Sequence, residues 1–345
     1  MNAIIFSRIC LGSIQTPLAF HDQVYYNECE IMAGRRPPAG GSNFGRTERN
    51  DPMEKILFDT DIGSDIDDAV CLAYLLCQPE CDLLGITTVS GQPYERAMLA
   101  SAVCRAAGKQ VPIYPGVGEP LLAAQRQPAA PQIKVLDKWA HDTEFPKNQA
   151  IEFMRRTIRE NPGEVTLLAV GPMTNVALLF ASDPEIAGLL KRLVLMCGVF
   201  TNRLAYVGPT EWNAICDPHA AEIVYRAPVL EHISIGLDVT CQVTMRKQEV
   251  AERFSRGVLR TVLDFAGVWF EHAELMTFHD PLAGAVIFDP DICRYENGNV
   301  SVEIGNTRVD GMTYWDPMPE GRHKVALQVD RDRFFEHYFG TVAGK

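Results

Sequence analysis

The sequence has no apolar run long enough to cross a membrane, and it has no excess of positive charge. A transmembrane helix needs about 20 consecutive apolar residues, whereas the longest apolar stretches here, such as residues 165–170, are short and bounded by turn residues. The chain has 32 Lys and Arg against 44 Asp and Glu, a net charge of −12. Nucleic acids and anionic membranes bind basic surfaces. We therefore expect neither a membrane nor a nucleic-acid partner.

Cysteine is also scarce, with 10 Cys in 345 residues. This is far below the density of a disulfide-stapled protein. No CxxC motif is present and no His lies near the closest pair, Cys77 and Cys81, so we expect no zinc site. The cysteines are expected to be small buried residues in a reducing compartment. We predict a cytoplasmic protein.

Two parts of the chain differ in pattern. Residues 1–52 contain Gly- and Pro-rich stretches and no sustained periodicity, which predicts a disordered or weakly attached extension. A secretory signal fits badly, because Arg8 interrupts the apolar stretch. The regular pattern begins at Met53, which is itself a candidate natural start. We predict a single domain over residues 53–345.

Strand-like and helix-like segments alternate from Met53 onward, except in residues 121–147, which show no clear period. This alternation is typical of an α/β fold with an open, mainly parallel sheet and helices on both faces. The expected strands are residues 56–59, 83–89, 111–114, 165–170, 193–196, 233–239, 300–304 and 325–329. The expected helices are residues 69–76, 95–107, 151–159, 174–180, 219–225, 246–254, 258–274 and 331–339.

Five aspartates follow the first expected strand within ten residues: Asp59, Asp61, Asp65, Asp67 and Asp68. Ligands of parallel sheets bind beyond the carboxyl ends of strands. Like charges packed so closely repel unless a cation neutralises them or solvent screens them, and helix capping explains one or two of them at most. All candidate ligands are oxygens, which predicts a hard cation, calcium or magnesium. The positions of Gly63 and Val70 exclude an EF-hand loop.

One alternative enzyme class shares part of this pattern. Asp59-x-Asp61 after a strand resembles the first motif of the haloacid dehalogenase-like phosphatases, which depend on magnesium. That motif has Thr or Val where Gly63 stands, and its acidic metal ligands lie far downstream rather than at Asp67 and Asp68. A phosphatase therefore stays open as the second enzyme hypothesis.

The segment Asp-Thr-Asp-Ile-Gly, followed by Asp67-Asp68 at a helix start, resembles the metal motif of the nucleoside hydrolases, the inosine–uridine preferring N-ribohydrolases. Ile62 stands where the family usually has Pro, and two extra residues precede Asp67. The resemblance runs from about Met53 to the C-terminus and implies an open, mainly parallel, Rossmann-like sheet. Further family elements are matched, in family order, by residues 87–92, 170–175, 211–218 and 279–283.

The resemblance implies calcium-dependent hydrolysis of the N-glycosidic bond of ribonucleosides, which gives ribose and free base. Asp61 would act as the general base on the metal-bound water, and His279 would protonate the leaving base. Calcium would be held by three carboxylates and one backbone carbonyl, those of Asp61, Asp68, Asp280 and Val170.

The same resemblance implies a set of substrate-binding residues, which are Asp67, Gln92, Glu211, Asn213 and Asp280. Gln92 replaces a family Asn that helps to hold the ribose and the attacking water. This replacement, with Ile62 and the two-residue insertion, keeps open a third hypothesis: a catalytically degenerate nucleoside- or sugar-binding homologue. The resemblance also implies a homodimer or homotetramer.

Overall fold

The computed structural model describes residues 53–343, so the predicted extension over residues 1–52 lies outside the described residues. The strands of the main sheet are β1 (Glu54–Thr60), β2 (Cys81–Thr88), β3 (Ile113–Pro115), β4 (Val165–Ala169), β5 (Arg192–Leu195), β6 (His232–Ser234), β9 (Cys293–Val302), β10 (Thr313–Pro317) and β11 (His323–Val329). A separate antiparallel pair is formed by β7 (Thr244–Arg246) and β8 (Leu275–Thr277).

The helices connect and cover these strands, and no helix between residues 53 and 343 has the length and apolar character to cross a bilayer. They are α2 (Asp67–Cys77), α3 (Pro93–Ala106), α4 (Ala150–Glu160), α5 (Thr174–Ser182), α6 (Ile186–Leu189), α7 (Trp212–Cys216), α8 (Pro218–Arg226), α9 (Leu237–Thr240), α10 (Lys247–Arg253), α11 (Leu259–Trp269), α12 (His279–Ala285) and α13 (Arg331–Val342), with the 3₁₀ helices η1 (Pro131–Lys138) and η2 (Pro290–Ile292).

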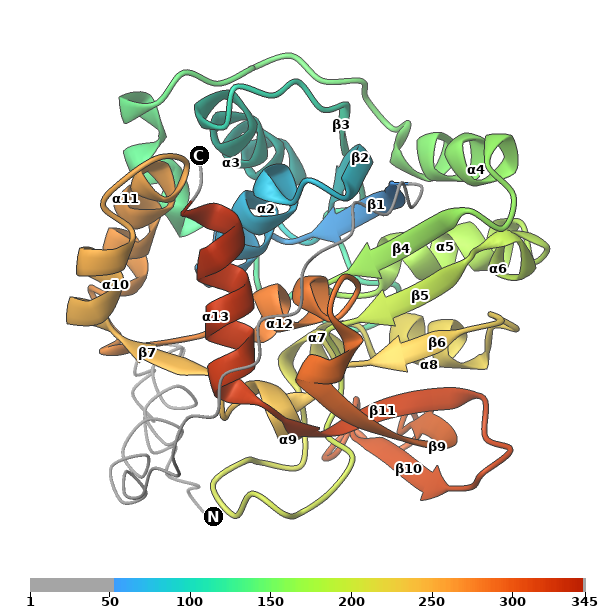
Figure 1. Ribbon diagram of the computed structural model, residues 1–345. Helices are drawn as coiled ribbons and strands as arrows, with labels where there is room; N and C mark the ends of the chain where they lie inside the picture. The colour runs from blue at the N-terminus through green and yellow to red at the C-terminus, as the bar shows by residue number, and fades with distance from the viewer. Residues whose placement is uncertain (1–52, 344–345) are drawn as a thin grey trace, which may run out of the picture. The chain divides into compact units, whose positions relative to one another are not determined.

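The main sheet has the strand order β10-β9-β11-β6-β5-β4-β1-β2-β3 (Figure 1). All pairs from β3 through to β11 are parallel. Only β9 and β10, at one edge, add antiparallel pairs. The predicted α/β fold with an open, mainly parallel sheet is confirmed.

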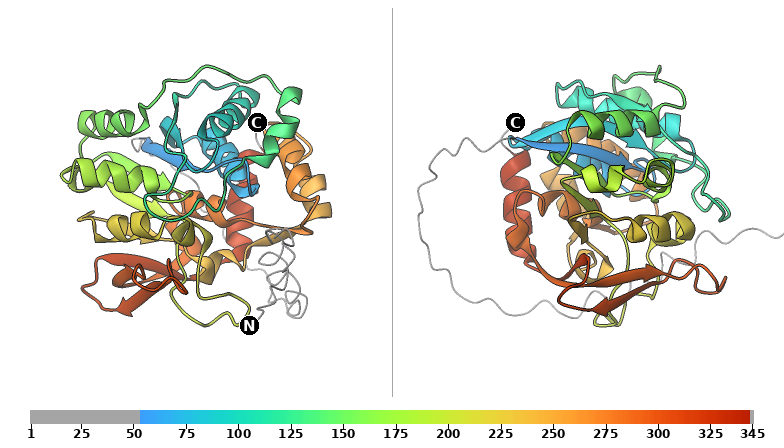
Figure 2. Two further views of the ribbon diagram at one scale, coloured as in Figure 1. Left: turned by 180° about the vertical axis from the view of Figure 1, so that it is seen from behind. Right: turned by 90° about the vertical axis from the view of Figure 1, so that its right-hand side faces the viewer.

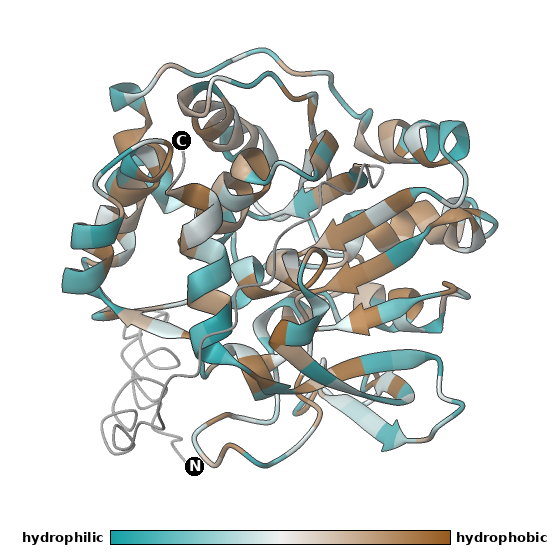
Figure 3. Ribbon diagram, viewed as in Figure 1, coloured by the Kyte–Doolittle hydropathy of each residue, from teal (hydrophilic) through white to brown (hydrophobic). Residues whose placement is uncertain are grey.

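Successive residues of the central strands enter two different cores. Phe58 of β1 and Leu168 of β4 pack with α2, α3, α11, α12 and α13, whereas Leu57 and Leu167 pack with α4, α5, α6 and α8. This division follows from the two-residue period of a strand. Figures 1 and 2 show helices on both faces of the sheet, and in Figure 3 the central strands β4 and β5 are largely hydrophobic. Burial on both faces explains their unbroken apolar runs.

The prediction of a strand over residues 233–239 is wrong for the second half of this segment. β6 ends at Ser234, and after Gly236 the chain forms the short helix α9. Ile235 and Val239 are both fully buried, so the apolar run continues through the change from strand to helix. Periodicity does not distinguish the two states when all sides are buried. The helix expected over residues 258–274 likewise ends at Trp269, before β8.

The antiparallel edge of the sheet was not predicted. β9 begins at Cys293, well before the expected start at residue 300, and β10 has no counterpart among the expected strands. Much of β9 and β10 is exposed, and polar residues such as Asn297 and Asn299 dilute the apolar signal. β10 is the edge strand of the sheet and β9 is its neighbour, and this solvated end of the sheet carries a weaker apolar pattern than the centre.

A buried histidine pair joins β6 to β11. His232 stands in register with His323 and stacks on Tyr225, with ring centroids 5.1 Å apart. Neither ring nitrogen of His232 has a hydrogen-bond partner within residues 53–343. Burial, with smaller contributions from His323 and Arg322, lowers the pKa of His232 well below 6.5.

We predict that His232 makes the fold sensitive to acid. The unfolded chain takes up a proton at this ring near pH 6.5, whereas the folded chain resists protonation to lower pH. The stability due to neutral His232 is therefore full above pH 6.5 and declines as the pH falls, by at most about 1.4 kcal/mol per pH unit. His232→Phe keeps the stacking on Tyr225 and removes the titration. Urea unfolding from pH 7 to pH 5 should show a smaller loss in the variant, and parallel pH profiles would contradict this.

Candidate active site

The Asp-rich segment connects β1 to α2. After Thr60 the chain turns through Gly63, whose φ of +122° is unfavourable for other residues. A Cβ at this glycine would also lie 2.7 Å from Leu99 Cδ1. The turn places Asp67 and Asp68 in the first turn of α2, where the helix dipole stabilises negative charge.

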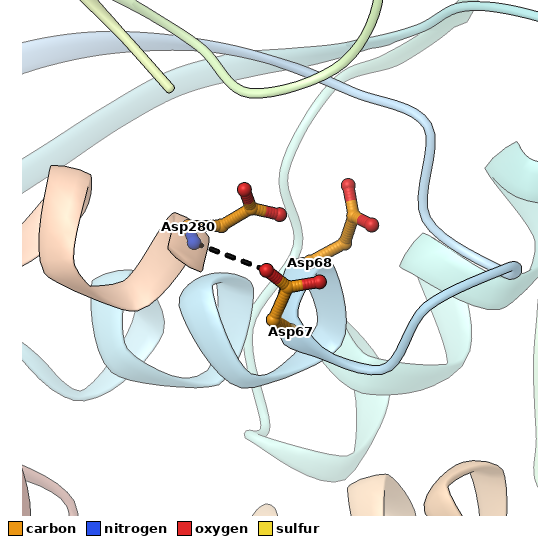
Figure 4. A group of neighbouring side chains, drawn as sticks. All are labelled: Asp67, Asp68 and Asp280. Carbon is orange, nitrogen blue, oxygen red and sulfur yellow. Dashed lines mark hydrogen bonds between the residues drawn. The ribbon is translucent and has the colours of Figure 1, made fainter. Parts of the chain in front are cut away.

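Asp280 reaches the same place from a distant part of the chain, in the first turn of α12. Its backbone N–H donates to Asp67 Oδ2 at 3.2 Å, as drawn in Figure 4. One carboxylate oxygen each from Asp67, Asp68 and Asp280 lies within 4.8 Å of the others, and all three residues are buried. We call these three residues the carboxylate group.

The electrostatics of the carboxylate group are unfavourable without a counter-charge. Burial raises the pKa of each of the three carboxyls well above its usual value. Charge repulsion raises two of these pKa values further. The charges of Asp61 and Asp67 act on Asp68, and the charges of Asp67 and Asp68 act on Asp280. A divalent cation would remove this repulsion, and a donor set made only of oxygens suits a hard cation. The residues present therefore fit a hard divalent metal.

Asp61 lies beside the carboxylate group, close enough for its charge to raise the pKa of each member. Its Oδ2 accepts a hydrogen bond from Gln127 Nε2. Its Oδ1 lies 2.8 Å from the position that a Cβ at Gly171 would occupy, so the turn after β4 needs a glycine here. Burial raises the pKa of Asp61, while the charge of Arg96 and the bond from Gln127 lower it.

A fully buried arginine holds the Asp61 segment in place. Arg96 lies in the first turn of α3, and its charge lowers the pKa of both Asp61 and Asp68. Its guanidinium donates to the backbone carbonyls of Asp61, Ile62, Gly91 and Ala129 and to the hydroxyl of Ser64. Arg96 therefore fixes the backbone of three segments and partly compensates the buried negative charge.

The start of α7 forms a further part of the site. Glu211 caps this helix, and its carboxylate accepts the N–H groups of Asn213 at 2.6 Å and Ala214 at 3.0 Å. Asn213 Nδ2 in turn donates to the backbone carbonyl of Val170 at 2.6 Å and to that of Met196 at 3.0 Å. Glu211 and Asn213 thus connect α7 to the carboxyl ends of β4 and β5.

The side chains of Gln92 and His279 are both hydrogen-bonded to other parts of the chain. Gln92 has a left-handed backbone, with φ +57°, and its Oε1 accepts the N–H of Ala130 at 2.8 Å. His279 Nδ1 lies 2.7 Å from Thr240 Oγ1. Burial lowers the pKa of His279 to about 4, so its imidazole is neutral at pH 7.

Comparison with known proteins decides the family. Residues 56–336 match the family model described as inosine-uridine preferring nucleoside hydrolase. The chain belongs to the nucleoside hydrolase family. The resemblance seen in the sequence is thereby confirmed, and the protein is a hydrolase that acts as a glycosylase. Because the family is that of the nucleoside hydrolases, the alternative hypothesis of a phosphatase is dropped.

Individual relatives span most of the chain. An inosine-uridine preferring nucleoside hydrolase from Leishmania major is 32% identical over 305 residues, which cover 81% of this chain and 95% of the relative. A probable uridine nucleosidase from Oryza sativa subsp. japonica is 30% identical over 288 residues, 76% and 84% of the two chains. The solved structure of a purine-preferring ribonucleoside hydrolase from Gardnerella vaginalis shares the fold, with a TM-score of 0.73, 24% identity and 84% and 98% coverage.

Of the residues predicted from the sequence, the structure brings Asp67, Asp68 and Asp280 together, with Asp61 beside them. The predicted calcium ligands included Asp61 and the carbonyl of Val170, whereas the compact carboxylate group contains Asp67, predicted to bind substrate, beside Asp68 and Asp280. The Val170 carbonyl accepts a hydrogen bond from Asn213 instead. The division of roles among these residues stays a prediction.

Two residues of the site were not predicted from the sequence. The position of Arg96 in the sequence could have indicated its role. A cation in the first turn of an apolar, Ala-rich helix opposes the helix dipole and needs a nearby anion. Gln127 gives none, because it lies in the irregular segment 121–147, whose backbone path no periodicity predicts.

We predict that a hard divalent cation stabilises the fold through the carboxylate group. Because the folded pKa values are raised, stability without metal falls as the pH rises through them. At pH 7.5, calcium should raise the melting temperature of the wild type over that in a chelator. Asp280→Asn removes one repelling charge, so the variant should melt higher than the wild type in chelator and gain less from calcium. An equal calcium shift in both proteins would contradict this, and Asp316→Asn, at an exposed carboxylate, is the control.

Proposed function

We propose that this nucleoside hydrolase cleaves the N-glycosidic bond of ribonucleosides with the help of calcium, giving ribose and free base. The observation that supports this most is the convergence of two aspartates of α2 with Asp280 of α12, beside Asp61. Buried carboxylates brought together from distant segments are costly. A binding site for a cation and a polar substrate accounts for their retention.

The proposed calcium ligands are Asp61, Asp68, Asp280 and the Val170 carbonyl. Calcium at such a site would lower the pKa of water and neutralise the surrounding carboxylates. For the Val170 carbonyl to take part, it must share its lone pairs with Asn213 Nδ2 or lose that hydrogen bond. The same oxygen ligands could also bind magnesium, so the choice between the two cations requires an activity assay with each metal after treatment with a chelator.

Asp61 is proposed as the general base. Its Oδ2 accepts a hydrogen bond from the Gln127 amide, and the carboxylate is proposed to take the proton of the attacking water. Such a base contributes about 10²–10⁴-fold to the rate. The water oxygen bonds to the anomeric carbon as the bond to the base nitrogen breaks, and positive charge develops on the sugar. The buried carboxylates favour that charge electrostatically.

The ribose diol is proposed to bind to Asp67, Asp280, Asn213, Glu211 and Gln92. Glu211 already accepts backbone hydrogen bonds from the start of α7, so its role includes the placement of Asn213. Polar groups that are built to bind a hydroxyl penalise a substrate that lacks it. We therefore expect ribonucleosides to be preferred over deoxyribonucleosides.

His279 is proposed to assist the leaving base. With a pKa of about 4, its ring is neutral at pH 7, so it acts as a hydrogen-bond donor rather than as an imidazolium. If Nδ1 accepts from the Thr240 hydroxyl, 2.7 Å away, the ring proton sits on Nε2 and is available to the base. Thr240 would thus select the tautomer.

A second candidate function is nucleoside binding without turnover. It is favoured by Gln92, which stands where the family has Asn and whose Oε1 is already bonded to the Ala130 N–H. The proposed cytoplasmic location is supported by the low cysteine content of the chain, 10 Cys in 345 residues. A homodimer or homotetramer is proposed on the family resemblance.

The test is release of free base from a panel of ribonucleosides and deoxyribonucleosides. We expect the wild type to act on at least one ribonucleoside, to lose activity in a chelator and to regain it with calcium. Asp61→Ala should lower kcat about 100-fold or more, whereas Asp316→Ala, at an exposed carboxylate of β10, should not. Nucleoside binding without base release would favour the second candidate. Turnover that persists unchanged in the chelator would refute the metal dependence.

A further inference from the structure

The side chain of Gln127 joins two parts of the candidate site. Its Nε2 donates to Asp61 Oδ2, and its Oε1 accepts the indole N–H of Trp212 at 2.9 Å. Gln127 is 9% exposed, whereas Trp212, the first residue of α7, is 42% exposed. The bridge therefore runs from a buried carboxylate to an aromatic ring at the surface.

The segment that carries Gln127 is bound to the turns around it. The N–H of Ala130 donates to Gln92 Oε1 at 2.8 Å, and the N–H of Gln132 donates to the Gly63 carbonyl at 3.1 Å. These bonds attach the segment to the turns after β1 and β2. The position of the Gln127 backbone is therefore set by the same turns that carry Asp61.

A carboxamide is well suited to this position. It presents a donor and an acceptor at a fixed separation, whereas a carboxylate only accepts and an indole only donates. Gln127 thus satisfies both neighbours at once. A single donor on Oδ2 restricts rotation of the Asp61 carboxylate and leaves Oδ1 unencumbered by Gln127. The acceptor restricts the indole of Trp212 in the same way.

We propose that Gln127 is a positioning residue of this hydrolase: it fixes the plane of the Asp61 carboxylate and couples it to the orientation of the Trp212 ring. The inference rests on the proposed function, in which Asp61 takes the proton of the attacking water. An error of about 1 Å in the placement of a reacting group can cost about 100-fold in rate. The effect of Trp212 on Asp61 then passes through Gln127.

The kinetic test is a double-mutant cycle of Gln127→Leu and Trp212→Phe, read as kcat and KM separately. Leucine remains compatible with burial and removes both hydrogen bonds. We expect Gln127→Leu to lower kcat about 10–100-fold and to change KM less than about threefold. Trp212→Phe should lower kcat less, and the double variant should be no slower than Gln127→Leu alone. Independent, multiplicative losses would overturn the coupling.

A second measurement does not depend on turnover. Acrylamide quenching of Trp212 fluorescence is measured in chelator. The Trp212 signal is the difference between the spectra with and without Trp212→Phe, and it is determined in the wild-type background and again in the Gln127→Leu background. We expect the released indole to be quenched more strongly in the Gln127→Leu background. Equal quenching would overturn the link between Gln127 and Trp212.

A third variant shifts Gln127 without altering its side chain. A Cβ at Gly91 would lie 2.4 Å from the Gln127 carbonyl and 2.5 Å from Pro128 Cα, so Gly91→Ala must displace this segment. It should reproduce the loss of kcat. Gln328→Leu, at an exposed position of β11, is the matched control and should keep wild-type kinetics. Melting temperatures of all variants show whether they fold.

The outcomes separate the two hypotheses. If the wild type releases no base from any ribonucleoside, the proposed function fails, and the role of Gln127 fails with it. If the wild type turns over and both Gln127→Leu and Gly91→Ala keep kcat within about threefold, the proposed function stands and only the positioning role is overturned.

Discussion

Repulsion among buried carboxylates is the constraint around which this hydrolase is built. Asp67, Asp68 and Asp280 come within 4.8 Å of one another in the interior, where charge is costly to bury. The fold meets this cost by joining the first turns of α2 and α12 and linking them through the Asp280 N–H. Both helix dipoles then act on the same anions. The closeness that makes the arrangement unfavourable alone is what makes it suit a divalent cation.

Arg96 shows how the neighbouring segment tolerates the same charge. A lone buried cation would be as costly as a lone anion, yet this guanidinium has carbonyl and hydroxyl partners from three segments and lies near enough to Asp61 to lower its pKa. It thus supplies a positive charge that stays in place whether or not a metal is bound. Because its bonds are mostly to backbone, it also determines the path of the turn that carries Asp61.

The sequence alone predicted the Asp-rich turn, because a short apolar run marks the end of β1 and ligands of parallel sheets bind beyond strand ends. Val170 and Asp280 were assigned through the resemblance to the nucleoside hydrolases. The prediction failed where all sides are buried, as in residues 233–239, and where an edge is solvated, as in β10. Gln127 was missed for a different reason. Its position depends on hydrogen bonds between loops, such as that from Gln132 to Gly63, and no local pattern encodes these.

A further group of polar residues lies at the ends of the strands next to the proposed site. It includes Asp59, an aspartate of the Asp-rich motif that binds neither the cation nor the sugar in the proposed mechanism. Asp59 Oδ1 accepts from Asn175 Nδ2 at 2.7 Å and from Thr87 Oγ1 at 2.5 Å. Burial, against these two bonds, raises the pKa of Asp59 to about 7. Asn175 Oδ1 also accepts the N–H of Val117, beyond β3. Asn175 Nδ2 donates in addition to the Thr88 carbonyl at 3.0 Å, so that this one amide connects the ends of β1 and β2 with the turn after β3. Asn175, at the start of α5, therefore holds together the ends of the strands, including the end of β1, which Asp61 directly follows.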